Sequence, residues 1–228
     1  MVHAFQEGSV PPGVADLLER TVVNLAGLRG IRHAILGIEP GDRSYRWIGA
    51  AGLADTAGNP MTPETPYFLA SVTKLYTGAA VLRLQEQGQL SIDDPLVNYL
   101  PADLVSGLHR HRGVDHTDVL TLRHLLGHAS GLPEYFSEAP KGKKTLLDMV
   151  LEEDDRGWEI TDIMEMVRAV YDAHFAPRPF DDRRHTIRYS DTNFQILIAM
   201  IEAVTGKHIH DALDRKSTRL NSSHRIRS

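Results

Sequence analysis

The order of hydrophobic patterns along the chain constrains its fold more than any other feature of the sequence. Residues 14–26 carry apolar side chains at helical spacing. Residues 31–47 then hold two β-rich runs separated by the turn Pro40-Gly41-Asp42, which predicts a hairpin. Most of the patterned segments that follow have helical spacing. A helix, a hairpin and then helices predict an α+β fold, although a two-stranded hairpin alone is only marginally stable.

Four further helices are predicted after the hairpin. One begins at or beside Ser71 and ends at Gly88, and a short one covers Leu122–Leu126. The last, Phe194–Val204, is apolar on nearly all sides and is followed by Gly206, so we expect it to be buried. The expected apolar face of the first is Val72, Leu75, Ala79 and Leu82.

Two segments between these helices are less regular. Residues 104–118 are expected to form a loop, and residues 134–158 are charged and weakly patterned. The remaining predicted helix can be capped by Thr161. The expected apolar face of the capped helix is Ile163, Met166, Val167, Val170 and Tyr171.

Composition excludes several classes of protein. The 228 residues are 42% hydrophobic and 24% charged, as in globular proteins, and the absence of cysteine excludes thiol catalysis, disulfides and thiolate metal sites. The net charge of −5 and the lack of a basic stripe with aromatics make nucleic acid an unexpected partner. No membrane segment or signal peptide is recognisable, so the chain as written is expected to be cytoplasmic, or periplasmic or secreted if the true start lies upstream.

The end of the chain has an unusual sequence. Asp214–His224 reads DRKSTRLNSSH, which matches the in-frame translation of a common sequencing-library adapter over eleven residues. We therefore expect residues 214–228 to be a non-native tail and the natural sequence to break off near Leu213. Composition alone would favour a basic, disordered tail that binds anionic partners.

Ser71 and Lys74 form the first candidate catalytic pair. On a helix their spacing places both side chains on one face, and a serine hydroxyl needs such a neighbouring group to become a nucleophile. At a helix N-terminus, Ser71 can also offer its backbone N–H as half of an oxyanion hole. The pattern S-x-x-K alone is weak, because Ser71 could be an N-cap and Lys74 a solvated lysine.

A set of motifs in a fixed order makes the prediction specific. The motifs are FLASVTK at 68–74, GQLSIDDP at 88–95, HLLGHASGLP at 124–133, YSDTN at 189–193 and VTG at 204–206. Together they resemble the family of class C β-lactamases, D-Ala-D-Ala carboxypeptidases and related esterases. The resemblance implies a β-lactamase/transpeptidase-like fold, with an antiparallel sheet flanked by helices. It also implies that residues 1–213 are a partial domain with a helical subdomain at about 90–190, and that the C-terminal strands are missing.

The resemblance implies a role for each site residue. Ser71 would be the nucleophile, Lys74 its proton partner and Tyr189 the general base or proton relay, and the choice of base between Lys74 and Tyr189 stays open. Asp191 stands where the family often has Asn. Its carboxylate could support the site by pairing with Lys74, or it could be an N-cap. A second register, with 190–192 as the Ser-Asp-Asn element, would lose the tyrosine.

The expected activity is that of a serine hydrolase that forms an acyl-enzyme on an ester, amide or β-lactam carbonyl. Its substrate would be a small molecule or peptide and no cofactor is expected, while the lack of an export signal favours an ester or small amide. The alternatives are a non-catalytic or acylable penicillin-binding sensor and an interaction protein.

Nothing in residues 207–228 matches the family's Lys-Thr-Gly or His-x-Gly element, so we expect the 228 residues alone to be inactive and prone to aggregate.

Twelve histidines raise the question of a metal site. His124 and His128 have the spacing of two ligands on one helical face, but Leu125 stands where a zinc protease has its glutamate, so no metal is expected. His109 and His111 lie in the predicted loop and are expected to be solvated. Residues 130–133 have the composition of a turn, and by the resemblance this turn lies near the site.

Overall fold

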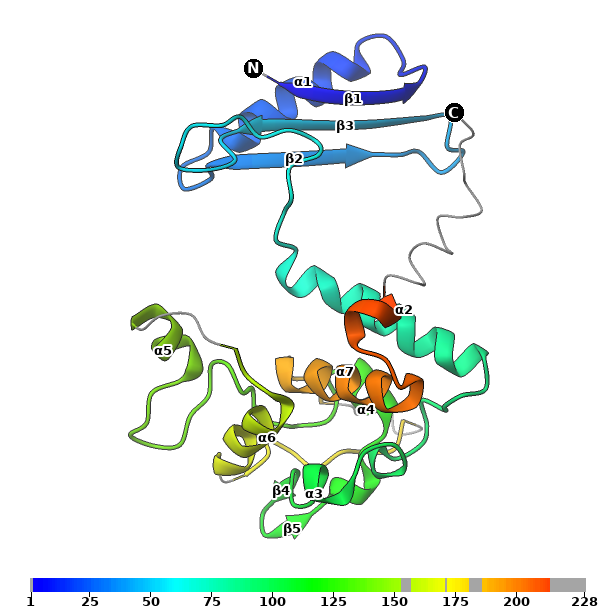
Figure 1. Cartoon of the computed structure of the whole chain (residues 1–228), viewed down its shortest axis with the longest axis vertical. Coiled ribbons are helices and arrows are strands. Elements are labelled where there is room, and N and C mark those ends of the chain that lie inside the picture. The colour runs from blue at the N-terminus through cyan, green and yellow to red at the C-terminus, as the bar shows by residue number, and fades with distance from the viewer. Residues whose placement is uncertain (1, 153–156, 171, 181–185, 214–228) are drawn as a thin grey trace. The chain divides into compact units, whose positions relative to one another are not determined.

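Two packing units, Met1–Leu69 and Ala70–Ser228, make up the computed structural model (Figure 1). Residues 2–152, 157–170, 172–180 and 186–213 are described, and each unit is considered by itself. The predictions for Tyr171 and for the tail 214–228 lie outside the described residues.

The first unit is an antiparallel sheet with a helix packed on it. Its elements are β1 (His3–Gly8), α1 (Val14–Ala26), β2 (His33–Ile38) and β3 (Tyr45–Gly52), and the strand order is β1-β3-β2. Val22 of α1 packs with Trp47 and Ala51 of β3. A Cβ at Gly49 would lie 2.2 Å from the Trp47 ring, so a glycine here makes room for the indole. The predicted helix and hairpin are confirmed.

The strand β1 was not predicted from the sequence. It pairs with β3 along its whole length, from His3 opposite Ala50 to Gly8 opposite Tyr45. Its residues are mostly exposed, and they lack the apolar alternation that marks a half-buried strand. The sheet therefore has three strands rather than the two that were expected.

The second unit is mainly helical and is built around α7 (Asp191–Thr205) (Figure 1). Helices α2 (Thr73–Glu86), α4 (Leu122–Leu126) and α6 (Ile160–Ala169) each pack against α7, and Leu197 and Met200 of α7 are fully buried. The shorter elements are η1 (Ala70–Val72), η2 (Leu96–Asn98), α3 (Ala102–Val105), β4 (Arg110–His111), β5 (Val114–Asp115), η3 (Thr117–Val119) and α5 (Leu146–Glu152).

The buried helix and the short helix were predicted correctly. Helix α4 has the expected bounds. Helix α7 begins three residues before the predicted start and is closed by the C-cap residue Gly206, whose φ of 63° is the left-handed conformation that glycine adopts readily. Within the described residues, no helix has the length and apolar character needed to cross a bilayer.

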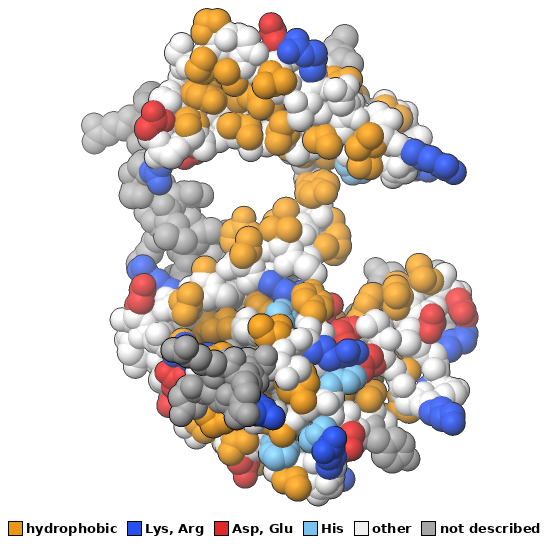
Figure 2. Space-filling view, turned by 180° about the vertical axis from the view of Figure 1, so that it is seen from behind, with side chains coloured by type: hydrophobic (Ala, Val, Ile, Leu, Met, Phe, Trp, Pro, Cys, Tyr) orange, Lys and Arg blue, Asp and Glu red, His pale blue; other side chains and the backbone are white. Residues whose placement is uncertain are grey.

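The predicted apolar face of α2 is wrong. Thr77, Ala80, Val81 and Leu84 are its buried residues, whereas Leu75 is 73% exposed. The helix carries apolar side chains on both sides, so periodicity alone does not select the buried face. Packing against α7 makes that choice. Apolar side chains are also exposed elsewhere on both units (Figure 2).

The predicted loop 104–118 contains regular structure, because β4 and β5 pair as a short hairpin around Arg112 and Gly113. The expectation that His109 and His111 are solvated is also wrong. His109 is fully buried, with Nε2 2.8 Å from the carbonyl of Ser130, and His111 is partly buried with Nδ1 2.8 Å from that of Ala173.

Two details of the segments around α6 also differ from the predictions. Helix α6 is capped by Glu159, which forms a capping box with Asp162, rather than by Thr161. Its buried residues are Ile163, Met164 and Val167, so Met164 takes the place expected of Met166. Helix α5 lies within the weakly patterned segment 134–158.

The turn at Gly131 gives a stability test. Gly131 and Gly142 both have a φ of 80°, but only at Gly131 would a Cβ meet backbone, 2.2 Å from the carbonyl oxygen of Phe175. Gly142→Ala should lower the free energy of unfolding by about 1–2 kcal/mol for the left-handed conformation alone. Gly131→Ala should cost about 1–3 kcal/mol more, because the backbone must move. Urea unfolding of both variants measures the difference, and equal losses would contradict the clash.

Candidate active site

Ser71 lies in the single turn η1, directly before α2. The preceding Ala70 has a φ of 46°, which is a strained value for a residue other than glycine. Val72, not Ser71, is the N-cap residue of α2, and no side chain caps this helix end. The hydroxyl of Ser71 is instead directed to the side chains described next.

The structure brings together all four residues that were predicted as site residues. The Tyr189 hydroxyl lies 2.9 Å from Ser71 Oγ, and Lys74 Nζ donates to the same Oγ at 3.2 Å. The Tyr189 hydroxyl donates to Asp191 Oδ1 at 2.7 Å, and Asp191 also forms an ion pair with Lys74. Tyr189 is 118 residues from Ser71 in the sequence, so the fold creates this contact.

These contacts define a direction for the hydrogen bonds. An ionised carboxylate only accepts hydrogen bonds, so the Tyr189 proton points toward Asp191. The Tyr189 oxygen is then free to accept the Ser71 proton, while the ammonium group of Lys74 donates to the Ser71 oxygen. The result is a continuous path from Ser71 through Tyr189 to Asp191.

The electrostatic surroundings of Lys74 favour its charged form. Burial of the side chain lowers the pKa of Lys74, but hydrogen bonds to Asp191 and Tyr189, with the charge of Asp191, outweigh burial and raise this pKa above its ordinary value. Asp191 was expected either to pair with Lys74 or to cap a helix. In the structure it forms the ion pair, and Ser190 is the N-cap residue of α7.

A buried polar network holds the start of α7 against residues 130–133. Ser190 Oγ and Thr192 Oγ1 both donate to the carbonyl of Pro133, at 3.0 and 2.7 Å. Ser130 Oγ donates to Asn193 Oδ1 at 2.6 Å, and all four of these polar side chains are fully buried. Their supporting role was missed from the sequence, although three polar residues directly before an apolar helix were a usable signal.

The histidines that suggested a metal site have other partners. His124 Nδ1 lies 3.1 Å from the backbone nitrogen of Thr121, and Nε2 lies 2.8 Å from the carbonyl of Arg178. Across the described part of the chain, no group of three or more His, Cys, Asp or Glu side chains is placed to hold a metal ion.

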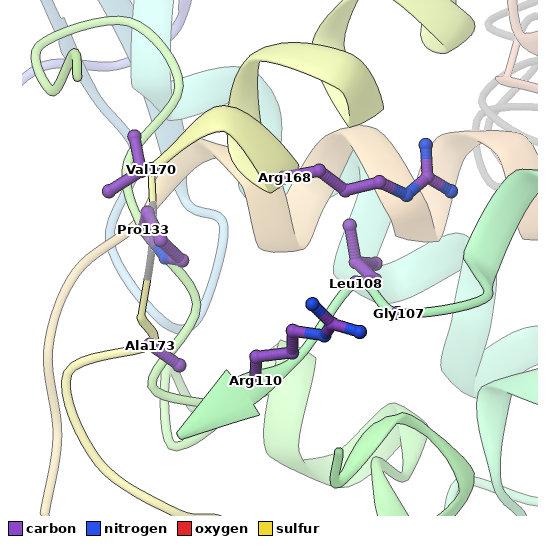
Figure 3. Close-up of a pocket in the computed structure, with 7 residues that line it drawn as sticks. All are labelled: Gly107, Leu108, Arg110, Pro133, Arg168, Val170 and Ala173. Carbon is purple, nitrogen blue, oxygen red and sulfur yellow. The ribbon is translucent and has the colours of Figure 1, made fainter. Parts of the chain in front are cut away.

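Two cavities in the described part of the second unit are lined by residues other than Ser71. The one shown in Figure 3 has a volume of about 10 Å³, room for about one water molecule. A second, more open cavity of about 310 Å³ lies beside α6. The first is lined by Gly107, Leu108, Arg110, Pro133, Arg168, Val170 and Ala173, and the second by Pro101, Asp103, Leu104, Ile160, Thr161, Glu165 and Arg168.

Comparison with known proteins identifies the family. The family model described as Beta-lactamase matches residues 19–224, so the chain belongs to the beta-lactamase family. That range includes 214–224, which lie outside the described residues. Esterase EstB of Burkholderia gladioli is 33% identical over 167 residues, 72% of this chain and 39% of the relative. Penicillin-binding protein 4* of Bacillus subtilis is 26% identical over 186 residues, 78% of this chain and 33% of the relative.

Solved structures of similar proteins agree with the fold. A D-stereospecific amidohydrolase from Streptomyces sp. aligns with a TM-score of 0.62 and 25% identity, over 90% of this chain and 53% of the other. An octameric penicillin-binding protein homologue from Pyrococcus abyssi aligns with a TM-score of 0.63 and 27% identity, over 89% and 42%. The predicted β-lactamase/transpeptidase-like α+β fold is confirmed. The chain spans about a quarter to two fifths of the curated relatives' length.

The ion pair predicts how one substitution changes Lys74. Asp191→Asn keeps a hydrogen-bond acceptor but removes the negative charge, so the pKa of Lys74 should fall. Competitive amine labelling of Lys74 against pH, read by mass spectrometry, measures this pKa. Glu152→Gln, which breaks the exposed pair with Lys144, is the matched control and should leave Lys74 unchanged. An unchanged Lys74 titration in Asp191→Asn would contradict the electrostatic account.

Proposed function

We propose that the chain carries the nucleophile and proton-transfer groups of a serine hydrolase that forms an acyl-enzyme on an ester, amide or β-lactam carbonyl. The hydrogen-bonded arrangement of Ser71 with Lys74, Tyr189 and Asp191 is the observation that carries the proposal. A serine needs an adjacent base and an electrostatic environment that favours the oxyanion, and these side chains supply both.

In the proposed first step, Ser71 Oγ attacks the carbonyl carbon of the substrate. The Oγ proton moves to the Tyr189 oxygen while the Tyr189 proton moves to Asp191, and the carbonyl π electrons pass to oxygen. The ammonium of Lys74 and the backbone N–H at the start of α2 stabilise the negative charge. Collapse of this intermediate returns a proton by the reverse path to the leaving group. Water then attacks the acyl-enzyme with the same relay as its base.

Tyr189 with Asp191 fits the role of base better than Lys74. A lysine at its ordinary pKa is unprotonated in only about one molecule in 2,500 at pH 7, and the pKa of Lys74 is raised further. The same ammonium group polarises the Ser71 oxygen through its hydrogen bond. We therefore assign Lys74 to charge stabilisation and the Tyr189–Asp191 pair to proton transfer.

Among the carbonyl classes we favour an ester. The relative named as an esterase shares 33% identity with this chain, compared with 26% for the relative named as penicillin-binding protein 4*. Esters also have better leaving groups than amides, so they demand less of the proton relay.

Covalent labelling tests the nucleophile. A fluorophosphonate probe reacts once with a nucleophilic serine and does not require turnover. It should form one adduct, and peptide mass mapping should locate this adduct on Ser71. Ser71→Ala should abolish the adduct, and Ser106→Ala, which removes an exposed serine elsewhere, should leave it intact. Labelling of folded protein at another residue, or none at all, would contradict the proposal.

Removal of the phenol tests the base. Tyr189→Phe should lower the rate of Ser71 labelling by about a hundredfold to ten-thousandfold, the usual range for losing a positioned proton acceptor. Far-ultraviolet circular dichroism checks that the variant is folded. A loss below about threefold would argue instead for Lys74 as the base.

A further inference from the structure

His128 has a left-handed backbone conformation, which is uncommon for residues other than glycine. It follows Gly127, the C-cap residue of α4, and its φ is 52°. Glycine or asparagine usually occupies this left-handed position after a helix, because other residues lose about 1–2 kcal/mol there. The conformation is fixed by backbone hydrogen bonds from His128 to Leu125 and from Arg188 to His128. A histidine at such a position calls for an explanation in its side chain.

The hydrogen bonds of the ring define its protonation state. The backbone N–H of Ser190 lies 3.2 Å from His128 Nδ1, and Asn193 Nδ2 lies 3.1 Å from the same atom. A backbone N–H can only donate, so Nδ1 must be an acceptor and the ring proton lies on Nε2. The amide of Asn193 is oriented by Ser130, whose hydroxyl donates to Oδ1 at 2.6 Å.

The ring of His128 packs against the phenol of the site. Its centroid lies 4.6 Å from that of Tyr189, with 30° between the planes, and 5.3 Å from that of Phe194. Tyr189 is 49% exposed, so among the described residues its ring has few packing neighbours to restrain it. Among the described residues, His128 is the aromatic ring that contacts it.

The charged groups around the ring also favour the neutral form. Burial and the nearby ammonium of Lys74, on α2, lower the pKa of His128, and the carboxylate of Asp191, on α7, opposes them in part. The hydroxyl of Tyr189 is the other titratable group beside the ring. Because this pKa is lower in the folded protein than in the unfolded chain, the unfolded chain binds more protons below pH about 6.5. His128 therefore lowers stability as the pH falls through that range.

We propose that His128 is a positioning residue for Tyr189: a neutral imidazole, tied to the start of α7 through Nδ1, whose ring holds the phenol beside Ser71. The inference rests on the proposed function of Ser71 and Tyr189, and it adds a residue that acts through Tyr189. It also explains why the polar network of Ser130 and Asn193 ends on this ring.

His128→Asn separates the two contributions of the side chain. Asparagine suits the left-handed backbone and its Oδ1 can accept from Ser190 and Asn193, but it has no ring to place against Tyr189. Fluorophosphonate labelling of Ser71 should slow about tenfold to a hundredfold, while the free energy of unfolding changes little. His174→Asn, which alters a histidine paired with Glu138, is the control and should label at the wild-type rate.

Nuclear magnetic resonance tests the proposal independently of Ser71 labelling. The ¹⁵N shifts of His128 should show an unprotonated Nδ1 and a protonated Nε2 at pH 7, and Tyr189 ring flips should be slower than in His128→Asn. A protonated Nδ1 at pH 7, unchanged ring flips or wild-type labelling in His128→Asn would overturn the proposal. If no form of the protein labels at Ser71, the proposed function fails, whereas the tautomer and the ring flips still decide the role of His128.

Discussion

The ion pair between Lys74 and Asp191 is the interaction on which the site depends. It links the first turn of α2 to the first turn of α7, and the same carboxylate accepts a hydrogen bond from Tyr189. The two side chains are 19% and 28% exposed, so neither is fully removed from water, and the cost of desolvation is smaller than for a fully buried pair. Without Asp191, Lys74 would lose its counter-charge and Tyr189 would lose the acceptor that orients its proton.

Such a pair is useful only if the two helix ends are held in fixed positions. Apolar packing between α2 and α7 sets their separation, and the hydrogen bonds from Ser190 and Thr192 to Pro133 fix the entry of the chain into α7. These hydroxyls are fully buried, and each would cost free energy if left without a partner. Because every group in this buried network has a partner, the network fixes the backbone directly after Tyr189, although the Tyr189 ring itself is half exposed.

The sequence predicted elements whose signals are local. The helical spacing of 14–26 and the apolar segment ending at Gly206 identified α1 and α7, since both depend on neighbouring residues. The strand β1 and the buried face of α2 depend on contacts with distant segments, and both were missed or wrong. His109 was placed in solvent for the same reason, because its partners at Ser130 and Phe175 are far away in the sequence. At the site, spacing alone paired Ser71 with Lys74, whereas Tyr189 required the family resemblance.

Asp191 shows why one position could not be decided from sequence. An aspartate before a helix is equally suited to cap it or to meet a distant cation, and only the distance to Lys74 separates the two roles. Once the pair forms, the Asp191 carboxylate acts against Lys74 as a base and in favour of Tyr189. It raises the pKa of Lys74, which disfavours the lysine as a base, and in the proposed mechanism it accepts the proton that leaves Ser71 through Tyr189. An asparagine at 191 could bond both partners but could not receive that proton, so in the proposed mechanism this single carboxylate decides which neighbour of Ser71 acts as the base.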